Sequence, residues 1–503
     1  MIKNFEKINS IFKVFTAVGF VLTIITAVFS VLHFHPDYDT QFLYQWSNEL
    51  LKGKTLYSDI AMLQTPLSAY FTSLFLLLHN SILSVHISIA VLVFILGFVL
   101  FLVSRELKIP PYLSLFCIFV WMCFNLADSF TVCNTYDYLS ISLYFLSFYF
   151  LLKHKRTNKQ INIIMTGISA ALCFFAKQTF GFYCVAFLGV YLISYWVKYK
   201  INFKTVLKEF LFISVPYILT FGAFILGFAL RRNLKDFLDC CVFGVSSFNN
   251  DLGGIKVLLS LSVLLIVFAG LPVTFKISAP LVVFLIGPML GLYPLMDVQR
   301  ILCFSCGYVI ITALILTKFL FPGKNNKKDS SRVLNIVFIF IISTVVLFSC
   351  VLIPVRQLKA PFYSDTKTAV KDYLCSLDVD VAAKIPNPYK SLFDFIDSSE
   401  NTENIHWMTS EAGFLDIYTD RYDGQYDLFL KGNFGSESPM DFFLANADKN
   451  DLFVLPSSDI TGWTGVASLY PKEVLEYIRE NYKQVDSITN KYGITEWNIY
   501  MMP

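Results

Sequence analysis

The chain has 503 residues, of which 55% are hydrophobic and 15% are charged, and its mean hydropathy is +0.59. Soluble globular domains carry about 25% charged residues, so this composition excludes an ordinary soluble protein, and no nucleic-acid partner is expected. The net charge of +3 hides a division, because residues 1–355 contain 27 Lys/Arg and 14 Asp/Glu, whereas residues 356–503 contain 13 and 23.

Long apolar runs recur along residues 1–355, and runs on the order of 18 residues or more indicate transmembrane helices. We therefore expect a polytopic α-helical membrane domain over residues 1–355, with about eleven spans. The spans are predicted near residues 14–34, 82–103, 112–130, 138–152, 161–178, 180–197, 209–230, 255–272, 279–294, 301–317 and 334–354.

The basic residues predict how the spans are oriented, because Lys and Arg gather in cytoplasmic loops. Lys3, Lys7 and Lys13 place the N-terminus inside the cell, and an odd number of spans then places the C-terminal part outside. A cleaved signal peptide is the alternative. However, the apolar run at 15–32 is longer than a typical signal-peptide core and lacks a small-x-small cleavage site. A multi-pass protein of the cytoplasmic membrane is the expectation.

The first outer loop, residues 35–80, places charge in a very apolar sequence. Charged side chains cost about 2.5–3.5 kcal/mol each at a membrane helix centre, so their placement near the bilayer calls for a reason. Asp37 and Asp39 follow the first span, and the helical spacing of apolar residues from 42 to 51 predicts an amphipathic helix in the membrane interface. Gly53 is expected to end this helix.

Further along the loop, Trp46 and Tyr44 suit the depth of the lipid headgroups. The apolar segment 67–78 is too short to span the bilayer. A carboxylate at a membrane surface, next to an interfacial helix, suits one reaction in particular. It can act as a general base that deprotonates an acceptor while a lipid-linked sugar loses its phosphate. The alternative is that Asp37 and Asp39 are solvated loop charges.

The loop resembles a known family in several residues at matching offsets. The family pattern is roughly D-E-x-x-(F/Y)…G…Y-x-D…P-P-L-x-Y, and the matching positions here are Asp39, Gly53, Tyr57, Asp59, Pro66, Leu67 and Tyr70. The family comprises GT-C membrane glycosyltransferases, in particular the bacterial group related to dolichyl-phosphate-mannose–protein mannosyltransferases and to the lipid A aminoarabinose transferase. The chain departs from the pattern at Thr40, where a second acid is common, and at Thr65, where the first proline stands.

The resemblance implies a GT-C fold and a glycosyltransferase that uses a polyprenyl-phosphate sugar donor. The acceptor would be a glycan, a lipid or a protein outside the cytoplasm. Asp39 falls at the position of the catalytic base, and Asp37 or Asp59 would orient groups around it. Tyr57 and Tyr70 would bind substrate. A transporter or flippase for lipid-linked sugars is the alternative function, and it would favour related halves and ionisable residues in mid-span.

Two cations at predicted outer turns are candidates for binding the donor phosphate. Lys177 lies in the turn between two spans, and Arg300 closes a later turn and has a guanidinium that can pair with phosphate oxygens in a bidentate fork. The alternative for Lys177 is an ammonium group that reaches water at a helix end. The alternative for Arg300 is an ion pair with Asp297 or simple interfacial anchoring.

A divalent metal ion is a further possibility at the start of the outer loop. His33, His35, Asp37 and Asp39 alternate, so an extended strand would place them on one face. Nitrogen and oxygen ligands of this kind can hold a divalent ion. His35 and Asp37 are therefore candidate ligands, and the spacing alone leaves the metal open.

Residues 356–503 have the composition and length of one soluble domain. Apolar runs such as 451–456 alternate with helical stretches such as 471–482, so we expect a mixed α/β domain outside the cytoplasm. The segment 406–435 combines aromatic and acidic side chains. This combination can bind sugars, and it also builds ordinary strands and turns.

Overall fold

The structure is a computed structural model. It describes residues 2–32, 36, 38–60, 62–128, 135–244, 277–292, 298–320, 365–377, 387–399, 404–409, 411–421, 438–457 and 471–503. The spans predicted at 255–272 and 334–354 lie outside the described residues, as does the predicted domain boundary after residue 355.

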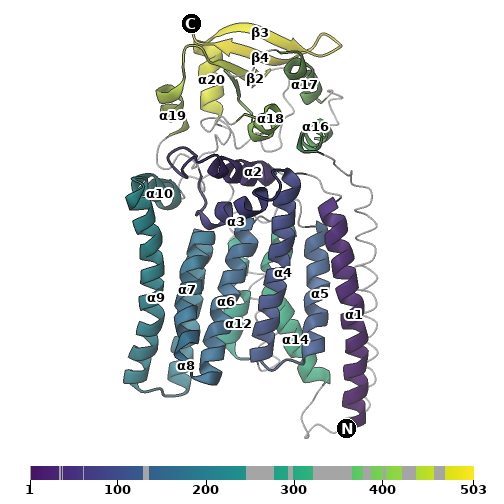
Figure 1. The fold of residues 1–503 in the computed structure, drawn as a ribbon, viewed down its shortest axis with the longest axis vertical. Coiled ribbons are helices and arrows are strands. Elements are labelled where there is room, and N and C mark those ends of the chain that lie inside the picture. The colour runs from purple at the N-terminus through teal and green to yellow at the C-terminus, as the bar shows by residue number, and fades with distance from the viewer. Residues whose placement is uncertain are drawn as a thin grey trace.

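The N-terminal part is a bundle of helices that run side by side along the long axis of the molecule (Figure 1). Its helices are α1 (Ile2–Leu32), α4 (Ile82–Glu106), α5 (Pro111–Asp128), α6 (Thr135–Thr157), α7 (Gln160–Ala176), α8 (Gln178–Lys198), α9 (Phe203–Leu230), α12 (Ala279–Ile286), the 3-10 helix η3 (Gly287–Leu292), α13 (Val298–Phe304) and α14 (Cys306–Leu320). The predicted helices that fall on described residues are confirmed, although α1 and α9 begin earlier than expected. Two are broken: 279–294 changes to a 3-10 helix at Gly287-Pro288, and 301–317 is interrupted at Ser305.

Four of these helices are long and apolar enough to cross a membrane: Phe12–Leu32, Ile82–Glu106, Gln178–Lys198 and Phe203–Leu230. Shorter apolar helices accompany them at Leu67–Leu76, Pro111–Leu126, Gln160–Ala176, Ala279–Leu292 and Cys306–Lys318. The exposed apolar side chains of α9, among them Ile218 and Leu219, are those expected of a helix that faces lipid. The total of about eleven spans stays a prediction.

Two short helices, α2 (Tyr38–Leu51) and α3 (Leu67–Leu76), lie across one end of the bundle (Figure 1). Gly53 follows α2 with φ +90°, which confirms it as the residue that ends this helix. The expectation for Tyr44 and Trp46 was wrong. Both side chains are buried, as are all residues from 40 to 49, so they do not lie among lipid headgroups.

Helices α3 and α4 pack against α2 and contribute to this burial. The C-terminal part lies over α2 and contacts it through α18 (Figure 1). It is built from α16 (Thr366–Ser376), α17 (Tyr389–Ser398), β1 (Ile405–Trp407), α18 (Ala412–Thr419), α19 (Pro439–Asn446), β2 (Leu452–Pro456), α20 (Lys472–Asn481), β3 (Lys483–Thr489) and β4 (Thr495–Met501). The strands form one sheet in the order β1-β2-β4-β3. β1 pairs with β2 in parallel, and the other pairs are antiparallel. Between the bundle and this part, α10 (Leu234–Leu238) and the π-helix η1 (Asp239–Phe243) follow α9.

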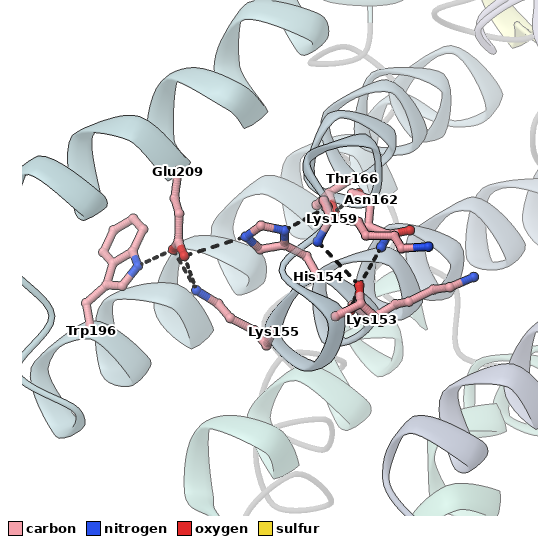
Figure 2. Close-up of polar contacts among 9 residues, drawn as sticks. Lys153, His154, Lys155, Lys159, Asn162, Thr166, Trp196 and Glu209 are labelled. Carbon is pink, nitrogen blue, oxygen red and sulfur yellow. Dashed lines mark hydrogen bonds and ion pairs between the residues drawn. The ribbon is translucent and has the colours of Figure 1, made fainter.

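A polar cluster ties three helices together at the opposite end of the bundle (Figure 2). The carboxylate of Glu209 on α9 accepts hydrogen bonds from the ammonium group of Lys155 on α6, at 2.6 and 2.7 Å, and from the indole of Trp196 on α8, at 2.7 Å. The His154 ring lies beside the same carboxylate, with 3.7 Å between Nε2 and Oε1. The charge of Glu209 is therefore paired, and this cluster lies at the helix ends, outside the apolar middle of the bundle.

The close approach of α7 and α9 generates a prediction. A Cβ atom built on Gly167 would overlap the backbone carbonyl oxygen of Ile213, whereas a Cβ on Gly189 of α8 meets nothing within 4 Å. Gly167→Ala should therefore destabilise the bundle by about 1–3 kcal/mol, as overpacking does. Gly189→Ala should be neutral or slightly stabilising, because alanine is the better helix former. The midpoint of thermal unfolding in detergent measures both, and equal midpoints would contradict the close packing.

Candidate active site

Side chains from four elements meet at the end of the bundle that lies beneath α2. Asp39 stands in the first turn of α2, and Tyr136 and Asp137 stand in the first turn of α6. Lys177 lies between α7 and α8, and Arg300 is on α13. These helices are far apart in the sequence, so the cluster is a product of the fold.

Asp39 faces two donors. The Tyr136 hydroxyl donates a hydrogen bond to its Oδ2 atom at 3.3 Å, and Nη2 of Arg300 lies 3.7 Å from the same oxygen. The side chains of Asp39 and Arg300 are 21% and 12% exposed, so the pair is partly buried and remains open to a ligand. Two residues predicted from the sequence to act on one substrate therefore lie next to each other.

Lys177 and Asp137 form a second ion pair in the cluster. Nζ of Lys177 lies 2.6 Å from Oδ1 of Asp137, whose side chain is completely buried. The same ammonium group lies 5.0 Å from the ring centroid of Tyr136, 5.6 Å from that of Phe180 and 5.7 Å from that of Phe304. Aromatic faces attract cations at such distances. The Lys177 side chain is 20% exposed, so it is held by the protein and does not reach freely into water.

The position of Lys177 follows from a one-residue break between two helices. Lys177 has extended backbone angles, φ −158° and ψ 118°, between the end of α7 and the start of α8. Hydrogen bonds join the outer loop to the end of α7 and to the start of α8. The Thr65 hydroxyl donates to the carbonyl of Phe174 at 2.9 Å, and the Gln178 amide donates to the carbonyl of Leu63 at 3.0 Å. The loop and the lysine turn are thus one connected unit.

Arg300 is held through its own short helix. The indole of Trp121 on α5 donates to the carbonyl of Leu302 at 3.0 Å, and the rings of Phe304 and Phe180 lie 5.2 Å apart. These contacts join α13 to α5 and α8. Asp297, the alternative partner predicted for Arg300, lies outside the described residues, and the described acidic partner is Asp39.

Tyr57 and Asp59 shape the outer loop. Asp59 is exposed, and its carboxylate accepts the backbone N–H of Thr55 at 2.7 Å. Tyr57 has φ +75°, its ring is buried, and its hydroxyl donates to the carbonyl of Gln64 at 3.0 Å. Burial is the main cause that raises the pKa of Tyr57 well above 10, so the hydroxyl keeps its proton. These contacts give both residues a role in the shape of the loop.

Tyr70 lies on α3, on the side that faces α9. It lines an open, mostly apolar groove of about 280 Å³ together with Phe224, Gly227, Phe228 and Arg231. The groove therefore has aromatic walls and a cation among its lining residues. The predicted role of Tyr70 in substrate binding stays a prediction.

The predicted metal ligands cannot be placed. His35 and Asp37 lie outside the described residues. Among the residues that the structure describes, no group of three or more His, Cys, Asp and Glu side chains could hold a metal ion. The role of Asp37 in orienting groups near Asp39 stays a prediction.

Tyr136 and Asp137 were missed as site residues in the sequence. The span was predicted to begin at residue 138, which left both residues in a loop. A signal was available, because an aspartate at the expected outer end of an apolar helix is costly unless it has a partner. The partner, Lys177, is 40 residues away in the sequence.

The Asp137–Lys177 pair predicts a compensating double substitution. Asp137→Asn or Lys177→Met alone leaves one charge without its partner in a buried place, which typically costs about 3–5 kcal/mol. The double variant removes both charges and should recover most of that stability. Thermal unfolding of the three variants measures this stability. If the stability lost in the double variant equals the sum of the two single losses, the two side chains do not interact directly.

Comparisons with known proteins give one family match and two solved structures of similar fold. Residues 63–219 match the model of the family described as dolichyl-phosphate-mannose-protein mannosyltransferase. The crystal structure of ArnT from Cupriavidus metallidurans bound to undecaprenyl phosphate is similar in fold, with a TM-score of 0.58, 11% sequence identity and 97% of each chain covered. The same protein in the apo state gives a TM-score of 0.55 and 10% identity, again with 97% of each chain covered. No curated protein matches the chain significantly.

The two kinds of likeness support each other. The matched segment contains Lys177, Asp137 and the loop that braces the lysine turn, and the shared fold extends over nearly the whole chain. The resemblance seen in the first outer loop is therefore confirmed: this chain is similar to the GT-C membrane glycosyltransferases of the protein mannosyltransferase and ArnT group.

Proposed function

We propose that the protein is a membrane glycosyltransferase that moves a sugar from a polyprenyl-phosphate donor to an acceptor outside the cytoplasm. One observation carries the proposal: Asp39 and Arg300 lie side by side at the end of an apolar bundle, with the Lys177 ammonium group in the same cluster. A base next to cations, at the surface of a membrane domain, suits a lipid donor with a phosphate leaving group.

Asp39 acts as the general base in this mechanism. Its carboxylate takes the proton from the acceptor hydroxyl or amine as the acceptor oxygen or nitrogen bonds to the anomeric carbon. The bond between that carbon and the phosphate oxygen breaks, and its electron pair leaves with the lipid phosphate. Both bonds change at the anomeric carbon, so the base and the phosphate site must both lie near that carbon. The neighbouring positions of Asp39 and Arg300 support this.

Arg300 and Lys177 stabilise the phosphate that leaves. The Arg300 guanidinium can bind two phosphate oxygens in a fork, and the Lys177 ammonium adds a point charge. Because both cations are fixed before the donor arrives, they need little rearrangement as charge develops on the phosphate. The Asp137 carboxylate holds Lys177 in place from the buried side.

The donor class and the sidedness are part of the proposal. Support for a polyprenyl phosphate comes from ArnT of Cupriavidus metallidurans, whose structure was determined with undecaprenyl phosphate bound. Support for an outer site comes from the Lys/Arg bias of the loops, which favours a cytoplasmic location for the opposite end of the bundle. The acceptor could be a glycan, a lipid or a protein.

The rival function, a transporter or flippase, has less support. A transporter of this kind is expected to hold its substrate near the middle of the bilayer, between broken helices. The ion pairs described here lie at the two ends of the bundle: Asp137 with Lys177 near α2, and Glu209 with Lys155 at the opposite end. This placement suits chemistry at a surface.

The experiment that tests the proposal is transfer from radiolabelled polyprenyl-phosphate sugar to extracted envelope acceptors by the reconstituted protein. Asp39→Asn should lower the transfer rate by about 100-fold or more, the usual contribution of a general base. Asp372→Asn, the same change at an exposed aspartate of α16, should leave the rate unaltered.

Two results would count against the proposal. Equal transfer by wild type and Asp39→Asn would remove Asp39 as the base. Movement of the labelled lipid across the vesicle membrane without any sugar transfer would favour the transporter.

A further inference from the structure

Helix α2 presents two opposite faces to two different parts of the protein. Asp39 points toward the bundle, where it contacts Tyr136 and Arg300. Gln41 lies two residues later, about 200° around the helix, and Gln45 lies one turn beyond Gln41 on the same side. Both glutamines are buried although they face away from the bundle, because the C-terminal part covers them.

The two glutamines hold the start of α18 by two hydrogen bonds. Oε1 of Gln41 accepts the backbone N–H of Phe414 at 3.2 Å, and Nε2 of Gln45 donates to the carbonyl of Gly413 at 3.2 Å. The residue that lies closest to both glutamine side chains is a glycine, Gly413. A Cβ atom on Gly413 would lie 2.8 Å from the Gln41 amide oxygen and 2.7 Å from that of Gln45. Both contacts are with the ends of glutamine side chains, so an alanine at this position would make Gln41 and Gln45 shift and would disturb the two hydrogen bonds.

The start of α18 is also held by contacts within the C-terminal part. The buried carboxylate of Glu411 accepts hydrogen bonds from the Tyr389 hydroxyl at 2.8 Å and from the Thr409 hydroxyl at 3.0 Å. The Tyr389 ring packs against Trp497 of β4, with 5.6 Å between the ring centroids. Burial, followed by the charge of Glu411, raises the pKa of Tyr389 well above 10, so its hydroxyl stays a donor at neutral pH. The helix that touches α2 is therefore anchored to the sheet.

We propose that Gly413, Gln41 and Gln45 are positioning residues for the transfer reaction. The docking of α18 fixes the rotation and the axial position of α2, and through them the place of the Asp39 carboxylate beside Arg300. This inference rests on the proposed function, since it takes Asp39 as the base. A displacement of about 1 Å in a reacting group can cost on the order of 100-fold in rate, so a small shift of α2 is enough to matter.

The inference predicts a particular kinetic signature. Lys177 and Arg300 do not lie on α2, so loosening α18 should leave the phosphate site intact while it displaces the base. Gly413→Ala in the full-length protein should lower kcat for sugar transfer about 10-fold or more. The KM for the donor and the affinity for polyprenyl phosphate without sugar should stay within about 2-fold of wild type.

Matched variants distinguish a positioning role from a nonspecific loss of folding. Gly222→Ala makes the same substitution on α9, where a Cβ meets nothing within 4 Å, and should transfer sugar at the wild-type rate. Gln45→Leu removes the donor to Gly413 at similar volume and should reproduce the loss in kcat. Gln41→Leu removes the acceptor for the Phe414 N–H and should lower kcat as well.

Amide hydrogen exchange gives a readout that does not depend on activity. The amides of α2 should exchange faster in Gly413→Ala than in wild type, and those of α7 should not change. Wild-type kcat and unaltered exchange in both Gly413→Ala and Gln45→Leu would overturn the inference, as would a loss confined to donor affinity. If Asp39→Asn retains transfer, the proposed function fails, whereas the docking of α18 on α2 is still judged by the exchange data.

Discussion

The buried ion pair between Asp137 and Lys177 is the constraint on which the arrangement of the site depends. A completely buried carboxylate at the end of an apolar bundle needs a cation, and this one has it at 2.6 Å. The pair joins the first turn of α6 to the junction of α7 and α8. It also holds the ammonium group against the Tyr136 ring, whose hydroxyl reaches Asp39. A charge that is needed for stability therefore also sets the distances between groups in the site.

The second constraint is that α2 belongs to both parts of the molecule. In the sequence it reads as an amphipathic helix, and such a helix is expected to place its polar face in water. In the structure its polar face is covered by α18, and the glutamines there bond to backbone groups of the C-terminal part. The membrane domain and the C-terminal part are consequently joined by the helix that carries Asp39, and the position of that carboxylate reflects contacts on both sides.

Most of the helices could be predicted from the sequence because their signal is local. Runs of apolar residues marked α4, α5, α7 and α8 to within a few residues and the end of α9 at residue 230, and Gly53 marked the end of α2. Asp39 was singled out by its match to the family pattern, and Lys177 and Arg300 were singled out by their places at predicted outer turns. The cover over one side of α2 was missed because it depends on residues more than 360 positions later, at the start of α18, which no local pattern contains. Asp137 was missed for a related reason, since its role is defined by a partner on another helix.

Thr65 has a consequence that reaches beyond its own position. The family pattern usually carries proline here, and proline has no hydrogen-bond donor. Threonine instead closes one of the carbonyls that α7 leaves open near its C-terminus, three residues before Lys177. A neutral hydrogen bond contributes about 0.5–1.5 kcal/mol, and a buried group that loses its partner costs about 1–3 kcal/mol, so this buried bond helps to keep the loop on α7. In this chain a side-chain hydrogen bond therefore joins the outer loop to the turn that holds Lys177, whereas a proline would stiffen the loop backbone and could not make this bond.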